Sequence, residues 1–128
     1  MWGKPPFYIP EGFALKVRDL KASRTWYKEK VGFRDGPKDV EDDSGNPYTV
    51  LQLRDGAILI LVETEQGSAM RSYGDVAPIF FAGNLGKARA WLEERGVSVE
   101  PVERDSGGNE LFHFVDLDGN RLEVCRET

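Results

Sequence analysis

Two side chains near the carboxyl-terminal end of the chain could bind or act on another molecule: His113 and Glu123. His113 is the only histidine, and an imidazole is the side chain that ordinarily titrates nearest neutral pH. Glu123 stands in an apolar run, where it binds a metal ion, contacts a ligand or faces solvent. A histidine and a carboxylate in contact can support a proton transfer. Two interpretations of His113 stay open: a partly exposed strand residue, or a pocket residue beside Glu123.

Cys125 is the single cysteine, and no second histidine or base motif accompanies it. A lone thiol of this kind is more typical of a small buried side chain than of a nucleophile. One cysteine cannot form an intrachain disulfide, so a reducing, cytoplasmic location is expected.

A predicted hairpin over residues 114–126 positions Glu123 and Cys125. The dipeptide Asp118-Gly119 supplies positive φ between two antiparallel runs. Successive side chains of a strand point to opposite faces, so Arg121, Glu123 and Cys125 share one face. In the preceding run, the same alternation places His113 and Leu111 on one face and Phe112 and Phe114 on the other.

The chain contains an internal repeat. Residues 19–26 and 84–91 share Leu, Arg and Trp at an offset of 65, and Asp-Gly turns recur at an offset of 63. Each helical segment opens on a good N-cap, Asp19 or Asn84. Each closes on a glycine, Gly32 or Gly96, as helix ends often do. Each copy therefore reads as strand, helix, strand and hairpin, a βαβββ module.

We predict helices at residues 20–31 and 85–95, whose apolar stripes place Trp26 and Trp91 in the core. A proline-rich arm, residues 1–10, precedes a single domain, residues 11–128. That domain divides into one module at 11–64, a linker at 65–75 and a second module at 76–128. The predicted strands are 12–18, 33–40, 48–54, 57–63, 76–82, 97–104, 110–116 and 120–126.

Composition excludes several classes of function. The 128 residues carry a net charge of −5, which argues against a nucleic-acid partner. No apolar run approaches the roughly 20 residues of a membrane span, and residues 1–10 do not have the pattern of a signal peptide. Phosphate-binding, nucleophile-elbow and paired-histidine zinc motifs are missing.

The motifs VRDLKASRTWY and FVDLDGNRLEV resemble the vicinal oxygen chelate superfamily, the glyoxalase, bleomycin-resistance and extradiol-dioxygenase group. The resemblance covers roughly residues 12–126 and departs at Leu117, where the family favours proline. It implies an α+β fold in which two tandem βαβββ modules form a curved, cup-shaped mixed sheet with helices on the outside.

In metal-dependent members, one residue from each of four strands binds a divalent metal. The resemblance and the repeat place these positions at Gly12, Ile60, Ala77 and Glu123. Only Glu123 has a donor atom, whereas a first-row metal needs about three. We therefore predict that the family metal site is absent. A slipped register would substitute Glu63 for Ile60, but it would also invert the whole strand.

Strand alternation predicts an organic ligand pocket inside the cup. Lys16 matches a position where glyoxalase-like enzymes carry a basic residue for a substrate carboxylate; alternatively it lies in solvent or pairs with Glu123. The predicted pocket residues are Gly12, Ala14, Lys16, Ile58, Ile60, Ala77, Ile79, Phe81, His113, Arg121 and Glu123.

The leading hypothesis is a metal-free protein that binds a small organic molecule, such as a drug or metabolite that it would sequester as bleomycin-resistance proteins do. The first alternative is a lyase or isomerase using Glu123, alone or together with His113, with or without a divalent metal ion such as zinc, nickel, manganese or iron. The second alternative is a protein-interaction module whose cup is filled by a partner or by the arm. The resemblance also implies a homodimer, with Trp2, Phe7 and Tyr8 as natural contacts.

Overall fold

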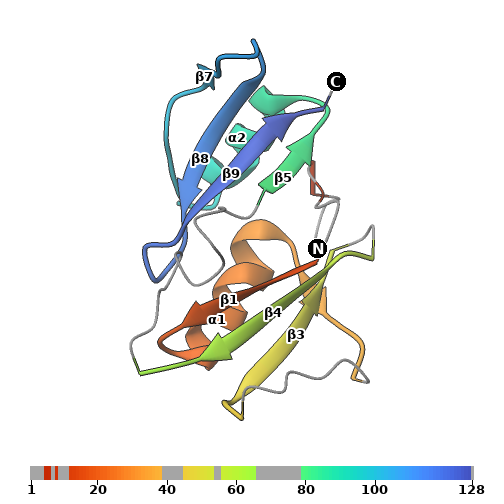
Figure 1. Ribbon diagram of the computed structural model, residues 1–128, viewed down its shortest axis with the longest axis vertical. Coiled ribbons are helices and arrows are strands. Elements are labelled where there is room, and N and C mark those ends of the chain that lie inside the picture. Colours follow the sequence, from red (N-terminus) through yellow and green to blue (C-terminus); the bar gives the residue numbers. More distant parts are fainter. Residues whose placement is uncertain are drawn as a thin grey trace.

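The computed structural model describes residues 5, 6, 8, 12–38, 45–53, 56–65 and 79–127. The two repeats form two stacked modules, each with its strands in front of its helix in Figure 1. The α+β class and the paired modules predicted from the sequence are confirmed. In the described part of the chain, hydrogen bonds divide the strands into two sheets, one from each module.

The amino-terminal sheet has the order β1-β4-β3-β2, with β1 parallel to β4. Its elements are β1 (Phe13–Val17), α1 (Leu20–Trp26), the π-helical turn η1 (Tyr27–Val31), β2 (Arg34–Asp35), β3 (Tyr48–Gln52) and β4 (Ile58–Glu63).

The carboxyl-terminal sheet has the order β5-β9-β8-β6, and β7 also pairs with β8. Its elements are β5 (Ile79–Ala82), α2 (Leu85–Glu94), β6 (Ser98–Val99), β7 (Glu103–Arg104), β8 (Glu110–Val115) and β9 (Arg121–Arg126).

Both helices begin at the predicted caps. The carboxylate of Asp19 accepts a hydrogen bond from the backbone N–H of Ala22 at 3.0 Å, and the Asn84 side chain accepts one from Lys87 at 3.0 Å. These bonds satisfy backbone donors that the first helical turn leaves without a partner. Gly32 adopts φ of 103° after the first helix, a conformation that glycine reaches without a steric cost.

Two predicted elements are corrected by the structure. The first helix is α-helical only to Trp26, because the carbonyl of Tyr27 accepts from the N–H of Gly32, five residues ahead, and η1 is a wider turn. The predicted strand 97–104 is two short strands, β6 and β7. Pro101, which lies between them, has no N–H for a sheet ladder.

The predicted strand 33–40 is also shorter than expected. It is limited to Arg34–Asp35 in the described residues, which stop at Lys38. Gly36 still donates to the carbonyl of Val50 at 2.8 Å, and Pro37 then lacks the N–H that would continue the ladder.

One hydrophobic core draws on both modules. The ring of Phe80 on β5 lies 5.9 Å from that of Phe13 and 6.3 Å from that of Phe33, both in the amino-terminal module. Trp26 and Trp91 pack against this core, as predicted. The indole N–H of Trp91 also donates to the carbonyl of Lys30 at 3.1 Å, which ties α2 to η1.

A buried polar network joins the modules at a second place. The hydroxyl of Tyr27 donates to the carboxylate of Asp116 at 2.6 Å, and Asn120 donates to that carboxylate from its backbone at 2.7 Å and its side chain at 2.9 Å. Burial raises the pKa of Asp116 above its ordinary value. The Asp and Asn of the FVDLDGN motif therefore hold the hairpin turn against η1.

Candidate functional site

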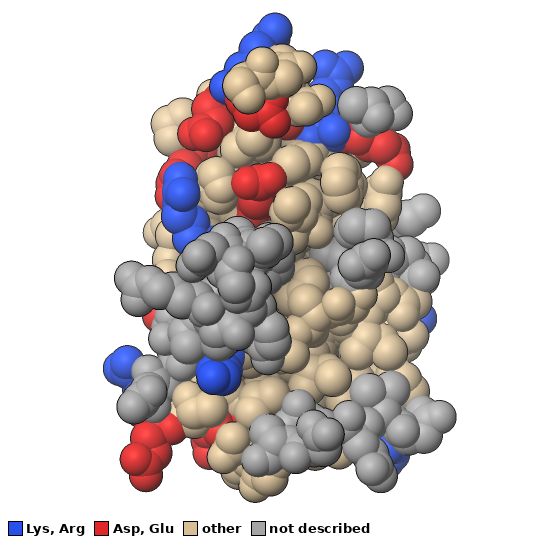
Figure 2. Space-filling view, viewed as in Figure 1, with Lys and Arg blue, Asp and Glu red and all other residues tan. Residues whose placement is uncertain are grey.

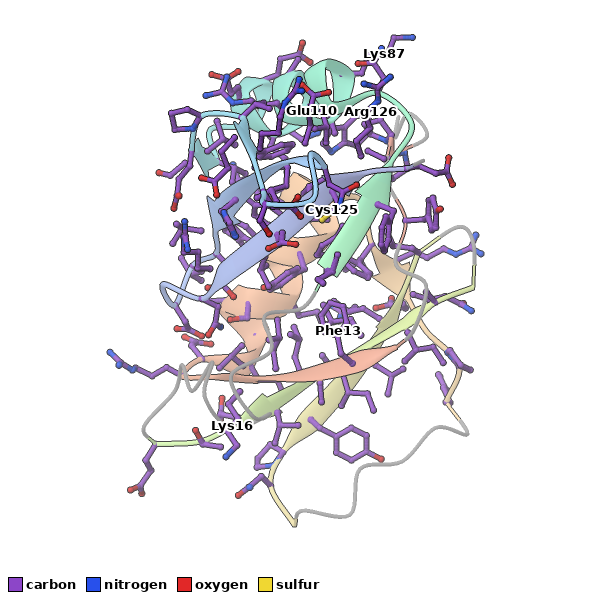
Figure 3. All side chains as sticks on the ribbon, turned by 45° about the horizontal axis from the view of Figure 1, so that its top comes forward. Phe13, Lys16, Lys87, Glu110, Cys125 and Arg126 are labelled. Atoms are coloured by element: carbon purple, nitrogen blue, oxygen red, sulfur yellow. The ribbon has the colours of Figure 1, made fainter. Side chains whose placement is uncertain are left out.

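Each sheet packs one face against the helices and leaves the other uncovered by them; we call the latter its open face. In β4, Leu59 and Leu61 are fully buried, whereas Ile58 and Ile60 on the other side are half-buried. Figure 3 shows Phe13 leaving β1 toward the other module and Lys16 leaving it on the opposite side. The sequence alternation therefore places the predicted residues of these strands on the open faces.

Two rows of cross-strand neighbours cross the open face of the carboxyl-terminal sheet. The first row is Ile79, Glu123 and His113, and the second is Phe81, Cys125 and Leu111. The equivalent rows of the amino-terminal sheet are Ala14, Ile60 and Val50, then Lys16, Val62 and Tyr48. Among the described side chains that Figure 2 shows on the face toward the viewer, most are uncharged, and acidic side chains lie mainly in the upper part and at the lower left.

The structure brings His113 and Glu123 together. The imidazole Nε2 lies 3.2 Å from the carboxylate Oε1, and His113 is 8% exposed. Its other ring nitrogen, Nδ1, is buried without a hydrogen-bond partner. If Nε2 carries the proton that binds the carboxylate, Nδ1 is left as an acceptor. The 8% exposure of His113 and its contact with Glu123 do not fit a partly exposed strand residue, and they agree with a position beside Glu123.

Cys125 completes the polar cluster. Its Sγ donates to Oε2 of Glu123 at 2.9 Å, so each carboxylate oxygen has one hydrogen-bonding neighbour. Burial, followed by the hydrogen bond and the negative charge of Glu123, raises the pKa of the Cys125 thiol to about 12. The group is therefore a neutral thiol at physiological pH, and it lacks the thiolate that nucleophilic chemistry requires.

Arg121 lies on the same face but is held by another partner. Its Nε and terminal nitrogen donate to the two carboxylate oxygens of Glu100 at 2.9 Å and 2.6 Å. This bidentate pair lies at the exposed end of β9. The guanidinium is thereby directed to Glu100.

Lys16 and Glu123 lie in different sheets. Lys16 stands opposite Val62, while Glu123 stands between Ile79 and His113. Among the described residues, no ion pair involves Lys16, so the expected pairing with Glu123 is not found there.

The remaining predicted pocket residues divide between the modules. Ala14, Ile58 and Ile60 lie on the amino-terminal open face, and Gly12 is exposed just before β1. Ala77 lies outside the described residues, as do Trp2 and Phe7 of the arm.

The positions that the resemblance assigns to metal ligands do not fit a metal ion. Gly12 and Ile60 offer no side-chain donor, and a Cβ added at Gly12 would meet the carbonyl oxygen of Ile58 at 2.9 Å. Glu63 does not replace Ile60, because its carboxylate accepts from the N–H of Leu20 at 2.8 Å. In the part of the chain that the structure describes, His, Cys, Asp and Glu form no group of three arranged to hold a metal.

The sequence did not indicate which residue Tyr8 contacts, although an arm that fills the cup was one of the alternatives. Tyr8 forms an isolated antiparallel bridge with Phe81, and the two rings stack with centroids 6.0 Å apart. Its hydroxyl also donates to Glu127. Tyr8, predicted to contact a second subunit, thus contacts β5 of its own chain. The proline-rich arm has no periodicity from which this pairing could be read.

Two surface depressions of about 480 and 490 Å³ lie away from Glu123. The first lies beside Asp35 and reaches Tyr48 and Val50 of the amino-terminal open face. The second lies between α1 and the exposed Leu117. Neither is lined by the His113–Glu123 pair, so we identify the site from the chemistry of the side chains. Among the described residues, no helix is long and apolar enough to cross a membrane.

Comparison with known proteins gives one family. The protein-family model described as Glyoxalase/Bleomycin resistance protein/Dioxygenase superfamily matches residues 11–124 of the sequence. No curated protein matches the chain.

Solved structures share the fold at low sequence identity. An integron cassette protein from the mobile metagenome of the Halifax Harbour sewage outfall has a TM-score of 0.74 and 22% identity, covering 91% of this chain and 97% of its own. TnmS3, an antibiotic binding protein from a Streptomyces species, has a TM-score of 0.70 and 21% identity, covering 92% and 94%. A glyoxalase family protein from Enterococcus faecalis has a TM-score of 0.69 and 24% identity, covering 90% and 94%.

Proposed function

Because this chain belongs to the Glyoxalase/Bleomycin resistance protein/Dioxygenase superfamily, we propose that it binds a small organic molecule on its open faces without a resident metal ion. The observation that carries the proposal is the retained scaffold combined with the donor set: Gly12, Ile60 and Ala77 have no ligating atoms, and only Glu123 does. A divalent metal held by one protein carboxylate would lack the ligands that a protein site normally supplies.

The chemistry of the open faces suits an organic ligand. Ligand sites are mostly apolar and carry a few fixed polar groups that orient the molecule. Here Ile60 and Ile79 are half-buried apolar side chains, and His113 fixes the carboxylate of Glu123 at 3.2 Å. TnmS3, which shares the fold, is an antibiotic binding protein, and small-molecule binding of this kind agrees with the proposal.

A homodimer is part of the proposal. Ile60, Ile79 and Glu123 on the open faces are only partly buried in the single chain, whereas Val62, Leu111 and His113 are buried. A second copy placed against the partly buried side chains would enclose a ligand between sheets. Light scattering coupled to size-exclusion chromatography measures this directly. A monomer at micromolar concentration would remove the dimer from the proposal and leave an open, single-chain site.

The functional test is a ligand screen by thermal shift in the presence of a chelator. A ligand that binds the folded state stabilises it by RT ln(1 + [L]/Kd), so a hit at 100 times its Kd adds about 2.7 kcal/mol. We expect organic hits that survive chelation and that weaken when Ile60 or Ile79 is changed to Asp. Hits that vanish with chelator would overturn the metal-free proposal.

A second candidate function, a lyase or isomerase, is favoured by one observation, the contact between His113 and Glu123. Such a pair can move a proton if a substrate atom comes within hydrogen-bond reach. Each hit from the screen should therefore be incubated with the protein and followed by NMR. Recovery of unchanged ligand supports sequestration, whereas turnover that is lost in His113→Gln and Glu123→Gln supports the enzyme.

A further inference from the structure

The open face of the carboxyl-terminal sheet has a single charge at its centre, and this charge indicates the class of ligand. We propose that Glu123 binds the cationic group of a protonated organic amine, whose apolar body lies across Ile79 and Phe81. The inference rests on the proposed small-molecule function and makes it specific. It follows from the partners of Glu123, the charges around it and the side chains beside it.

The two polar neighbours of Glu123 leave its carboxylate able to accept further hydrogen bonds. His113 approaches one oxygen at 3.2 Å and the Cys125 thiol the other at 2.9 Å. A thiol and an imidazole that donates from Nε2 can both do so as neutral groups. Each carboxylate oxygen accepts more than one hydrogen bond, so both retain capacity for a ligand N–H. The side chain is 22% exposed, which leaves it reachable.

The surrounding charges favour a cation over an anion. Among the described residues, no Lys or Arg forms an ion pair with Glu123. Arg121 is engaged with Glu100, and the charges of Glu100, Glu103 and Glu123 all act on that one guanidinium. Three carboxylates therefore act on the one guanidinium of Arg121, which is already engaged by Glu100. A half-buried carboxylate that has no Lys or Arg partner among the described residues is costly to desolvate, and a cationic ligand offsets that cost.

The neighbours of Glu123 supply the apolar part of the site. Ile79 stands directly opposite Glu123 on β5, and Phe81 stands opposite Cys125. The ring of Tyr8 stacks on that of Phe81 and extends the aromatic surface. Aromatic rings attract cations placed over their faces as well as apolar groups. An amine attached to an aromatic or aliphatic body matches this combination better than a carboxylate does.

The test uses three probes of one shape: 2-naphthylmethylamine, 2-naphthylmethanol and 2-naphthoate. Binding is measured by calorimetry at pH 7 in chelator, at low and high salt, with the wild-type protein, Glu123→Gln and Glu94→Gln. Glu94 is exposed at the end of α2, so its variant changes the net charge equally and leaves the site intact. Circular dichroism confirms that each variant is folded.

We expect the amine to bind wild type at least about tenfold more tightly than the alcohol, the effect of one charge-assisted hydrogen bond. The naphthoate should bind most weakly. Glu123→Gln should abolish the preference for the amine and change alcohol binding by less than about twofold. Glu94→Gln should behave as wild type. If Glu123→Gln does not fold, the test is the ratio of amine to alcohol affinity in the wild-type protein. This ratio should decrease as the salt concentration rises.

Two outcomes would overturn the inference, and only the second would also contradict the proposed small-molecule function. If the alcohol or the naphthoate binds as tightly as the amine, the cationic ligand class is wrong and the small-molecule function stands. If none of the three probes binds at millimolar concentration, the open face is not a site for amphipathic aromatic molecules. Both the inference and the proposed function are then contradicted.

Discussion

The two repeats share one backbone and differ in chemistry. The central row of the amino-terminal open face is Ala14, Ile60 and Val50, and that of the carboxyl-terminal open face is Ile79, Glu123 and His113. The strand pairings are equivalent at offsets of 65 and 63 residues. One row is wholly apolar and the other holds a carboxylate and an imidazole. The central amino-terminal row supplies no polar side chain, so a site built from these two rows has one apolar side and one polar side.

The same contrast recurs where the modules join. Tyr27, Asp116 and Asn120 form a buried polar network, and their repeat counterparts at the same offsets are Leu92, Leu53 and Ala57. Leu92 and Leu53 are fully buried in the core. The same three positions of the repeat are thus occupied by hydrogen-bonded polar side chains in one case and by apolar side chains in the other.

Breaking the polar network should have the largest effect. Asp116→Ala removes the acceptor of Tyr27 and of two Asn120 donors, leaving buried polar groups without partners. We expect a loss of about 3–5 kcal/mol in the free energy of unfolding, measured in urea. Tyr27→Phe, which removes one donor and keeps the ring, is the control and should cost less. A loss below about 1 kcal/mol in Asp116→Ala would contradict a structural role for the network.

Making the two open faces alike should stabilise the protein. The double variant His113→Val and Glu123→Ile copies the row of Val50 and Ile60. It removes the unpartnered Nδ1 and a half-buried carboxylate. Replacing buried polar groups by apolar ones of similar size often adds stability, here about 1–3 kcal/mol.

Urea unfolding measures the gain from this double variant, and calorimetry should show that amine binding is lost. The reverse variant, Val50→His with Ile60→Glu, is the matched control and should be destabilised. A double variant less stable than wild type would show that the polar row is structural.

The fold was predictable because repeats, caps and alternation are local signals. Asp19 and Asn84 mark helix starts, and the alternation around the Asp118-Gly119 turn assigns the open face. Contacts between distant segments were not predictable in the same way. The bond from Tyr27 to Asp116 and the pairing of Tyr8 with Phe81 join residues that no short pattern relates.

The candidate site was partly predictable for the same reason. Alternation places His113 and Glu123 on one face, but their contact depends on the register of β8 against β9, which the sequence analysis did not assign. Val50 was missed, although the repeat offset of 63 from His113 leads to it. Pro101 also carried a signal, since a proline in a run predicted as one strand weakens that prediction.

Cys125 reports on the electrostatic environment of the carboxyl-terminal open face. Its repeat counterpart, Val62, has no titratable group, so the amino-terminal face has no equivalent probe. The raised Cys125 pKa of about 12 predicts very slow alkylation by iodoacetamide at pH 8 and a rate that rises with pH. Glu123→Gln removes the negative charge, lowers the pKa and should raise the rate by about tenfold. Rapid alkylation of the folded wild type would contradict the assigned environment.

The same thiol affects stability at alkaline pH. The folded state holds the proton to a higher pH than the unfolded chain, in which a cysteine titrates near about 8.5. As the pH rises above that value, the unfolded chain loses the proton first, so stability falls. Cys125→Ala should flatten this part of the stability profile, and an unchanged slope between pH 9 and 11 would contradict the raised pKa.

The smallest effect is expected at the rim. Arg121 corresponds to Ile58 in the other repeat, and its bidentate pair with Glu100 is half-exposed. Arg121→Ile should change the free energy of unfolding by less than about 1 kcal/mol, because exposed ion pairs are screened and contribute little. A double-mutant cycle with Glu100→Gln isolates the pair. A coupling free energy well above about 1 kcal/mol would contradict the prediction that this exposed pair contributes little to stability.

The most direct test of the account is the metal content of the purified protein, with parallel thermal melts in zinc, nickel, manganese and iron. With one donor among the four positions, we predict far less than one metal ion per chain and no shift in the melting temperature. A near-stoichiometric metal, or stabilisation by several degrees with one of these ions, would contradict the metal-free proposal. The ligands would then be sought among His113, Glu123 and Cys125.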